Sequence, residues 1–314
     1  MNILITGGAG FIGSNLTASL LQKGHRVSVF DNLSMKTESF LSQYISNPRF
    51  KFIKIDLINK KQLQENLSSN IDLVFHLAAN SDIAKSAKSP EIDFQNTILA
   101  TFNILCEMKA KGIKKIFYTS GSGVYGDIGD KFASEDLGPL LPVSMYGATK
   151  LSAESMISAF VKLFDMQAWI IRPANIIGPN LTHGVLFDFI MKLRQNSANL
   201  EILGDGRQSK SYIYVSDVIE AMFLILEKAK RDINIFNLSS DTFITVNEIA
   251  KIIIREMNLK KVNIFYRGGK IGWKGDIAKV RIDNSRLKKL GWREHYSSRG
   301  VVLKTVRVLL GKEK

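Results

Sequence analysis

A glycine-rich segment near the amino terminus constrains the fold of this chain more than any other feature. Residues 6–13 read Thr-Gly-Gly-Ala-Gly-Phe-Ile-Gly, and they lie between a short apolar run and a helical pattern. Glycines in this context permit a tight turn, a close approach of the backbone to a ligand, and close packing of the helix on the strand. The helix amino terminus adds free N–H groups and a positive dipole end. The segment therefore predicts a site for the pyrophosphate of a dinucleotide.

An acidic residue lies where a dinucleotide site needs one. Asp31 ends the second predicted strand, downstream of Gly13. A carboxylate at this place accepts hydrogen bonds from the ribose hydroxyls and repels a 2′-phosphate. We therefore predict NAD, rather than NADP, as the cofactor.

Short apolar runs alternate with helical patterns over the first half of the chain. This alternation predicts right-handed βαβ crossovers, and hence an α/β fold of the Rossmann type with a doubly wound parallel sheet. The expected strands are 3–6, 26–30, 50–55, 73–76, 115–120 and 168–172, and the expected helices are 11–23, 60–67, 93–111 and 146–164.

After Pro173 the pattern loosens, and glycines and prolines separate shorter elements. We expect an NAD-binding domain over residues 1–172 and a smaller α/β substrate lobe over residues 173–314. The expected elements of this second part are helices at 185–193, 217–230, 246–257 and 299–310 and strands at 211–215 and 233–238, the last of which returns to the main sheet.

Composition narrows the class of protein further. The chain has 43 Lys and Arg against 29 Asp and Glu, but the excess is scattered in pairs, which favours a solvated basic surface over a nucleic-acid interface. A single cysteine, Cys106, excludes an internal disulfide. No apolar run approaches the roughly 20 residues that span a bilayer. Met1 leads directly into a strand, so we expect no signal peptide and a cytoplasmic location.

A tyrosine and a lysine in the second half of the first domain carry the predicted chemistry. Tyr146 and Lys150 are four residues apart, which places them on one face of a helix. A phenol with a pKa of about 10 is a poor base at neutral pH, but a nearby ammonium group and a positive nicotinamide ring favour the phenolate. Such a tyrosine takes a hydroxyl proton while hydride leaves the same carbon. Such a pair by itself would be interpreted as a contact on a helix surface. Because the same chain also carries a predicted dinucleotide site, the pair predicts catalysis.

Two further strand ends fit this site. Asp56 and Leu57 close the third strand, and a histidine followed by Leu77, Ala78 and Ala79 closes the fourth. Both lie at the carboxyl ends of parallel strands, where open α/β sheets bind ligands. We interpret the histidine, His76, as structural rather than catalytic.

Taken in order along the chain, these motifs resemble the extended short-chain dehydrogenase/reductase family, in its nucleotide-sugar epimerase/dehydratase branch. The residues that carry the resemblance are TGGAGFIG (6–13), DNLS (31–34), HLAA (76–79), VYG (124–126), YGATK (146–150), RPANIIGP (172–179), GDGRQSKSYIYVSD (204–217) and GWKGD (272–276). Residues 182–193 with the GDGRQSKSY stretch are most similar to archaeal-type UDP-galactose/UDP-glucose 4-epimerases.

The resemblance implies a set of binding residues and an assembly. It implies that Lys150 binds the nicotinamide ribose and that the chain forms a homodimer through a four-helix bundle of helices near 93–111 and 146–164. It implies substrate contacts from Ser122, Asn175, Lys210, Trp273 and Asp276. The implied NAD contacts are Gly7, Gly10, Phe11, Ile12, Gly13, Asp31, Asn32, Asp56, Leu57, Leu77, Ala78, Ala79, Asn96, Ser120, Tyr146, Lys150 and Pro173.

The chain departs from the family pattern at three positions. Gly121 stands where members usually carry a catalytic Ser or Thr, and Ser122, one step along, is the candidate replacement. Lys210 and Trp273 stand where many members carry an arginine that binds the diphosphate. A lysine still offers a point charge to a phosphate, but not a bidentate fork.

The same loop distinguishes between reactions. In the family that the chain resembles, 4,6-dehydratases carry an Asp-Glu pair just before the VYG motif. This chain has Ser122 and Gly123 at those two positions. The absence of acids favours NAD-dependent 4-epimerisation of a nucleotide hexose, with Tyr146, Lys150 and Ser122 as catalytic residues. Two alternatives stay open at this point: a nucleotide-sugar dehydratase or reductase, and a catalytically degenerate NAD-binding protein.

Overall fold

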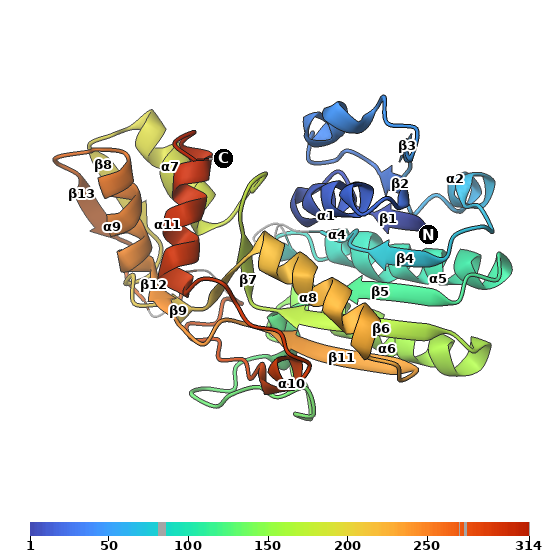
Figure 1. Ribbon diagram of the computed structural model, residues 1–314. Helices are drawn as coiled ribbons and strands as arrows, with labels where there is room; N and C mark the ends of the chain where they lie inside the picture. The colour runs from blue at the N-terminus through green and yellow to red at the C-terminus, as the bar shows by residue number, and fades with distance from the viewer. Residues whose placement is uncertain (81–85, 270, 273–274, 314) are drawn as a thin grey trace.

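The computed structural model describes residues 1–80, 86–269, 271–272 and 275–313. Its centre is a seven-stranded parallel sheet with strands in the order β11 (Ile233–Leu238), β6 (Gln167–Pro173), β5 (Lys115–Thr119), β4 (Leu73–His76), β1 (Asn2–Thr6), β2 (Arg26–Asp31) and β3 (Phe50–Lys54) (Figure 1). The doubly wound α/β fold predicted from the sequence is confirmed. The strand order reverses between β1 and β4, which is where such sheets bind ligands.

Alternate residues of the strands enter two separate cores, one on each face of the sheet. In β1, Ile3 and Ile5 belong to one buried cluster and Leu4 to the other. Each such side chain stabilises the fold by roughly 1.5–3 kcal/mol when it is fully buried. The first face is covered by α1 (Phe11–Gln22) and α8 (Val215–Lys228), and the second by α2 (Lys60–Asn66), α5 (Ala100–Ala110) and α6 (Met145–Phe164).

The segment expected as one helix over 93–111 is divided into three parts. A short α4 (Glu91–Asp93) leads into a π-helix, η2 (Phe94–Leu99), which continues as α5. A π turn closes i→i+5 hydrogen bonds and is frequent at functional sites. The predicted helical stretch is therefore present, and the π-helical segment within it is the feature that the sequence pattern did not indicate.

The second part of the chain forms a smaller lobe beyond the carboxyl ends of the main strands (Figure 1). Its strands pair two by two, and a capping box between Thr245 and Glu248 begins the helix Val246–Glu256. The paired strands are β7 (Asn175–Ile177) with β10 (Tyr212–Tyr214), β8 (Asn199–Ile202) with β13 (Asn263–Tyr266), and β9 (Ser209–Lys210) with β12 (Ile244–Thr245). Its helices are α7 (Val185–Gln195), α9 (Val246–Glu256) and α11 (Ser298–Leu309). The short α10 (Ser285–Lys289) lies instead beside β11 of the main sheet (Figure 1).

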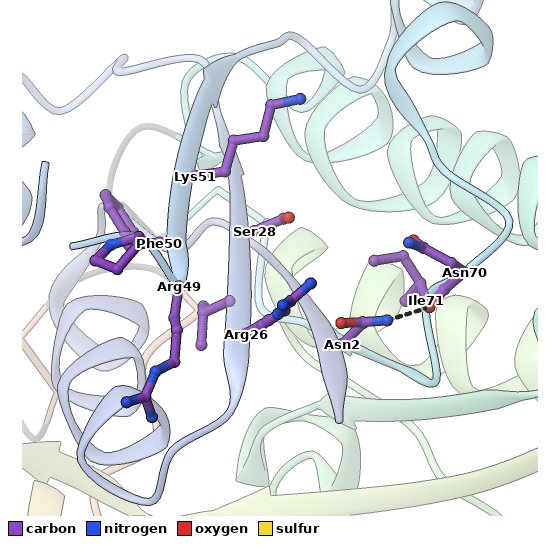
Figure 2. Close-up of a pocket in the computed structure, with 10 residues that line it drawn as sticks. Asn2, Arg26, Ser28, Arg49, Phe50, Lys51, Asn70 and Ile71 are labelled. Atoms are coloured by element: carbon purple, nitrogen blue, oxygen red, sulfur yellow. Dashed lines mark hydrogen bonds between the residues drawn. The ribbon is translucent and has the colours of Figure 1, made fainter. Parts of the chain in front are cut away.

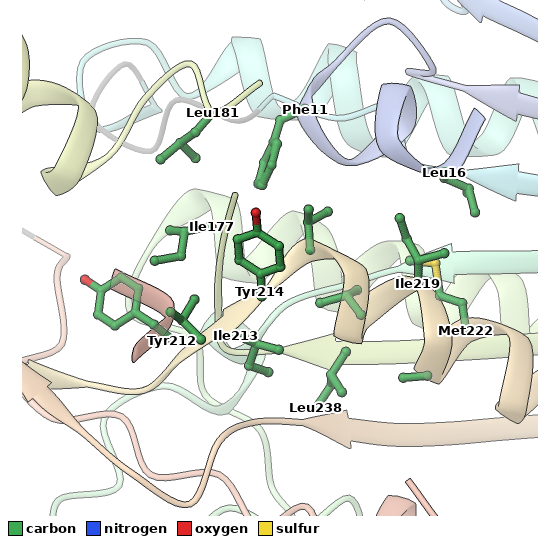
Figure 3. Close-up of a cluster of buried hydrophobic side chains, with 14 of the residues drawn as sticks. Phe11, Leu16, Ile177, Leu181, Tyr212, Ile213, Tyr214, Ile219, Met222 and Leu238 are labelled. Carbon is green, nitrogen blue, oxygen red and sulfur yellow. The ribbon is translucent and has the colours of Figure 1, made fainter. Parts of the chain in front are cut away.

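The glycine-rich turn is packed against the smaller lobe. Phe11 of this turn belongs to the same buried cluster as Leu181 and Tyr214, as Figure 3 shows. The amide of Asn15 also donates to the carbonyl of Pro179 at 3.1 Å. The dinucleotide turn and the lobe that follows β6 are therefore held together by both apolar and polar contacts.

A hollow lies at the amino ends of β1, β2 and β3, on the opposite edge of the sheet from the glycine turn. Figure 2 shows Arg26, Ser28, Lys51 and Asn70 on its walls, and a hydrogen bond of 3.0 Å from the Asn2 amide to the Asn70 carbonyl. Ligands of open α/β sheets bind at carboxyl ends, so this hollow is not the candidate site. No helix in the described part of the chain is long and apolar enough to cross a membrane.

Candidate active site

The glycine turn has a shape that only glycines can form. Gly7 has a positive φ of 71°, and a Cβ on it would lie 2.7 Å from the backbone nitrogen of Ala78. A Cβ on Gly13 would clash with the carbonyl oxygen of Gly7. Among the described residues no side chain caps α1 at Gly10, so its first N–H groups are available to a pyrophosphate.

Asp31 lies beside this turn at the end of β2. One carboxylate oxygen accepts from the Ala9 N–H at 3.0 Å and the other from the Leu33 N–H at 2.8 Å. Burial raises the pKa of Asp31, and these two hydrogen bonds oppose that rise. Each oxygen keeps a lone pair for a ribose hydroxyl. Next to it, the Asn32 amide donates to Asp56 at 3.4 Å. This arrangement fits the adenosine half of NAD.

His76 is a structural residue, as interpreted from the sequence. Its ring is fully buried between two threonine hydroxyls, with Nδ1 2.6 Å from Thr6 and Nε2 2.9 Å from Thr101. Burial, with a smaller effect of the Lys150 charge, lowers the pKa of His76 to about 3. The imidazole is therefore neutral at physiological pH.

Tyr146 and Lys150 lie in the first turns of α6. The Ser144 hydroxyl accepts from the Gly147 N–H at 3.1 Å and so fixes the start of this helix. Lys150 is buried, and its ammonium group donates to the Thr119 carbonyl at 2.8 Å and lies 5.7 Å from the centre of the Tyr146 ring. The helix thus brings both groups to the carboxyl end of β5, the same edge of the sheet at which the glycine turn follows β1.

The protein alone keeps Tyr146 in its phenol form. Burial, followed by the charge of Asp93, raises the pKa of Tyr146 to about 12. Burial lowers the pKa of Lys150 to about 8, although Glu154 and Asp93 oppose this effect. The expectation that Lys150 lowers the pKa of the tyrosine is therefore not met by the protein groups. Bound NAD would add the positive nicotinamide charge that is expected to favour the phenolate.

The loop before Tyr125 presents backbone to the Tyr146 ring. A Cβ on Gly121 would lie 3.3 Å from the Tyr146 hydroxyl, and a Cβ on Gly123 would lie 3.6 Å from Cδ1 of the same ring. Ser122 lies between these two glycines and is partly exposed. At the position where the family usually carries a hydroxyl, this chain therefore has only the glycine backbone next to the Tyr146 phenol.

The remaining cofactor residues expected from the sequence lie on or near the same edge. Leu57 follows β3, the residues Leu77 to Ala79 follow β4, and Pro173 ends β6. The Ser120 hydroxyl, directly after β5, is buried and has no hydrogen-bond partner in the described part of the chain, which suits a group that contacts a ligand. Asn96 lies in η2 and donates to the Ile92 carbonyl at 2.9 Å. The glycine turn and the start of α1 hold the others, namely Phe11 and Ile12.

The expected substrate residues lie mainly in the smaller lobe. Lys210 and Asp276 form an ion pair at 2.6 Å, so these two are brought together. Asn175 begins β7 and donates to the Ser211 carbonyl at 3.2 Å. Trp273 lies outside the described residues.

The roles of three buried charged residues at the site were missed from the sequence. Asp93 is fully buried, and one of its oxygens accepts from the Asn80 amide at 2.8 Å. The other oxygen has no hydrogen-bond partner among the described residues. Arg172, at the end of β6, holds Glu154 of α6 through two nitrogens, at 3.0 and 2.6 Å. Arg172 also donates to the Tyr125 hydroxyl at 3.1 Å. Glu154 continues the Tyr146–Lys150 spacing by four more residues, which is the signal that could have found it.

Comparison with known proteins agrees with this geometry. Residues 3–239 match the NAD dependent epimerase/dehydratase family. A relative from Methanocaldococcus jannaschii, provisionally named as a UDP-glucose 4-epimerase, is 31% identical over 93% of this chain and 92% of its own. The matched family is the one that the sequence motifs resemble.

Solved structures cover the chain almost completely. The Thermotoga maritima UDP-glucose 4-epimerase, solved with UDP-glucose, superposes with a TM-score of 0.89 at 29% identity and covers 99% of each chain. The Bacillus cereus UDP-glucuronic acid 4-epimerase, solved with UDP-glucuronic acid and NAD, superposes with a TM-score of 0.87 at 28% identity, again over 99% of each chain. The chain belongs to the NAD-dependent epimerase/dehydratase family of enzymes, and NAD is its cofactor.

Proposed function

We propose that the chain catalyses the 4-epimerisation of a UDP-hexose of the glucose/galactose type. The observation that carries this proposal is the position of Tyr146 and Lys150 at the carboxyl end of β5, beside a loop without acidic residues. That loop, residues 119–126, reads Thr-Ser-Gly-Ser-Gly-Val-Tyr-Gly. Elimination of water from C5 and C6 needs an acid and a base there, whereas epimerisation at C4 needs only the tyrosine.

The reaction follows from the positions of these groups. Tyr146 accepts the proton of the sugar 4-hydroxyl as C4 loses hydride, which leaves a 4-keto sugar. NAD, when bound, accepts this hydride and returns it. The keto sugar turns about its diphosphate link, C4 regains hydride on the other face, and Tyr146 returns the proton. Lys150 keeps the tyrosine oriented and adds a positive charge 5.7 Å from its ring. Over one cycle, one hydride and one proton each leave the sugar and return to it.

The direct test is an assay of the purified protein with single nucleotide sugars. UDP-glucose, UDP-galactose, their N-acetyl forms and the uronates are incubated separately, and the products are resolved by chromatography. We expect the 4-epimer of a neutral hexose to form without net consumption of NAD or NADH. If no 4-epimer forms from any of these sugars, the proposed function is wrong; a deoxy product would instead indicate a dehydratase.

We further propose that Ser122 supplies the hydroxyl that is missing at Gly121. Ser122→Ala should then lower kcat by about a hundredfold, the lower end of the range for general acid–base groups. Adding Gly121→Ser to this variant should recover part of the loss, because the new side chain would contact the Tyr146 hydroxyl. Steady-state kinetics on both variants measure this. An unchanged kcat in Ser122→Ala would show that Tyr146 acts without this serine.

We also propose that the exposed face of α5 and α6 is covered by a second copy of the chain. Phe102 of α5 is 40% exposed and Leu163 of α6 is 70% exposed. Phe102 packs edge-on against Phe160, with ring centres 6.3 Å apart, so the apolar face is continuous across both helices. Large exposed apolar patches mark interaction surfaces, and two such helix pairs would form a four-helix bundle.

Light scattering after size-exclusion chromatography tests this assembly. We expect a mass of twice 35.1 kDa for the purified chain. Phe102→Glu should shift the protein to the monomer, because a carboxylate would be buried in an apolar interface. A monomeric wild-type protein at micromolar concentration would contradict the proposed dimer.

A further inference from the structure

The Lys150 side chain places an ammonium group in the interior without a carboxylate to pair with it. The residue is 3% exposed, and no carboxylate of the described residues forms an ion pair with it; Glu154, on the same helix, is paired with Arg172 instead. Buried charges are normally paired, because their removal from water is costly. Lys150 donates to the Thr119 carbonyl at 2.8 Å, and its nitrogen lies over two aromatic rings, 5.0 Å from the centre of the Tyr118 ring and 5.7 Å from that of Tyr146. Tyr146 reacts, whereas the proposed reaction gives Tyr118 no role.

The Tyr118 ring is held in place by other buried groups. It is fully buried in β5 and stacks on the His76 ring of β4, with ring centres 5.7 Å apart and an interplanar angle of 26°. His76 is itself held by the hydroxyls of Thr6 and Thr101. The Tyr118 hydroxyl has no hydrogen-bond partner among the described residues, and burial raises its pKa well above the ordinary value. Tyr118 therefore stays neutral, and its ring, rather than its hydroxyl, is the part that meets the ammonium group.

We propose that Tyr118 is a positioning residue for Lys150, whose ammonium group its ring face keeps charged and in place beside Tyr146. The inference rests on the proposed function for the role of Lys150 and adds a residue that acts through that lysine. The face of an aromatic ring is electrically negative and attracts a cation within about 6 Å of its centre, most strongly where water is excluded. A lysine has three N–H donors, and the Thr119 carbonyl takes one. A ring attracts the charge without accepting the donors that a ribose hydroxyl needs, whereas a carboxylate in its place would accept them.

The other groups around Lys150 do not replace the ring. Burial lowers the pKa of Lys150 to about 8, and the charges of Glu154 and Asp93 only partly oppose this fall. Burial, with a smaller effect of the Lys150 charge, lowers the pKa of His76 to about 3, so the imidazole is neutral. The titratable and charged groups of the surrounding elements are Tyr146 and Glu154 of α6, Asp93 of α4, His76 of β4, Tyr118 of β5 and Arg172 of β6. The variants below change Tyr118 and leave the rest of this set in place.

Titration of the Lys150 side chain by NMR tests the proposal without turnover. The NAD-containing protein is labelled with ¹³C at the lysine Cε, and the Lys150 signal is identified by its loss in Lys150→Arg. Tyr118→Leu should lower the pKa of Lys150 by about one unit, the size expected for loss of a desolvated cation–π contact. Phe117→Leu is the matched control and should leave this pKa unchanged. Phe117 is equally buried in the same strand, but it enters the opposite core, where it packs on Phe75 with ring centres 5.2 Å apart.

A second series changes the charge of the ring face and keeps its size. Phenylalanine, 4-fluorophenylalanine and 3,4,5-trifluorophenylalanine are incorporated at position 118, and each added fluorine withdraws electrons from the ring face that attracts the cation. Tyr118→Phe should keep the wild-type pKa of Lys150, and the pKa should fall stepwise along the fluorinated pair. Because the ring keeps its shape, this series tests the proposal even where Tyr118→Leu does not fold. Thermal melting verifies the fold of each variant.

Two results would overturn the proposal. One is a Lys150 pKa that stays the same along the fluorinated series, and the other is an equal shift in Tyr118→Leu and Phe117→Leu. If the titration shifts as expected but no 4-epimer forms, the proposed function fails while the contact of Tyr118 with Lys150 stands. Turnover of a nucleotide sugar with an unshifted Lys150 would remove only the role of Tyr118.

Discussion

Replacing Tyr146 with phenylalanine should lower the epimerase kcat by about a thousandfold, within the range for loss of a general acid–base group. The variant removes one oxygen and keeps the ring. No described residue donates to or accepts from this hydroxyl, so its loss breaks no structural hydrogen bond. The proton of the 4-hydroxyl would then have no acceptor at the carbon that loses hydride. A thousandfold loss corresponds to about 4 kcal/mol in the activation barrier.

The control for this variant is a second tyrosine near the same lysine. Lys150 lies 5.0 Å from the centre of the Tyr118 ring, and the buried Tyr118 hydroxyl has no hydrogen-bond partner among the residues that the structure describes. Tyr118→Phe should therefore keep its activity, and both variants should retain the NAD content and melting temperature of the wild type. Near-normal turnover by Tyr146→Phe would remove the tyrosine from the mechanism.

The glycine turn and its surroundings could be predicted from sequence because their signals are local. Gly7 and Gly13 need their residue type for reasons of shape within a few residues, and Asp31 closes the very next strand. The pleat of the strands is equally local: in β1, alternate residues enter opposite cores. Local rules of this kind give strand order and layer arrangement once right-handed crossovers are assumed.

Elements that depend on distant partners were not predicted. Asn175–Ile177 is a strand only because it pairs with Tyr212–Tyr214, and Asn199–Ile202 only because it pairs with Asn263–Tyr266. The expected strand at 211–215 was correspondingly too long, since Val215 already begins α8. The π turn at Phe94–Leu99 likewise interrupts a pattern that reads as one regular helix.

The electrostatics of the site escaped prediction for the same reason. The i,i+4 spacing of Tyr146 and Lys150 indicates proximity but not direction, and the lysine directs its ammonium at the Thr119 carbonyl. Burial of the phenol and the charge of Asp93 then set the pKa of Tyr146. Both effects arise from tertiary packing, which brings α4 beside α6. The motif therefore predicts which residues react, whereas their protonation states depend on tertiary packing.

Glu154→Ala should destabilise the protein by about 3–5 kcal/mol, the usual cost of breaking a buried ion pair. The side chains of Arg172 and Glu154 are each only 5% exposed, and their closest atoms are 2.6 Å apart. Removal of the carboxylate would leave the Arg172 guanidinium charged, because the carboxylate raises an arginine pKa that is already very high. Denaturant unfolding measures this loss of unfolding free energy. Thermal melting of the same variant should show a Tm lowered by roughly 10 °C.

An exposed ion pair on the same helix provides the control. Lys162 of α6 contacts Asp232 at 2.7 Å, with side chains that are 64% and 68% exposed. Asp232→Ala should cost less than about 1 kcal/mol, because water screens this pair. The contrast between the two variants isolates burial as the cause. Since Glu154, Lys150 and Tyr146 share one face of α6, Glu154→Ala should also lower kcat at temperatures where the variant is folded. Equal losses of stability in both variants would show that Arg172 is not held by Glu154, and that α6 is positioned by its apolar face alone.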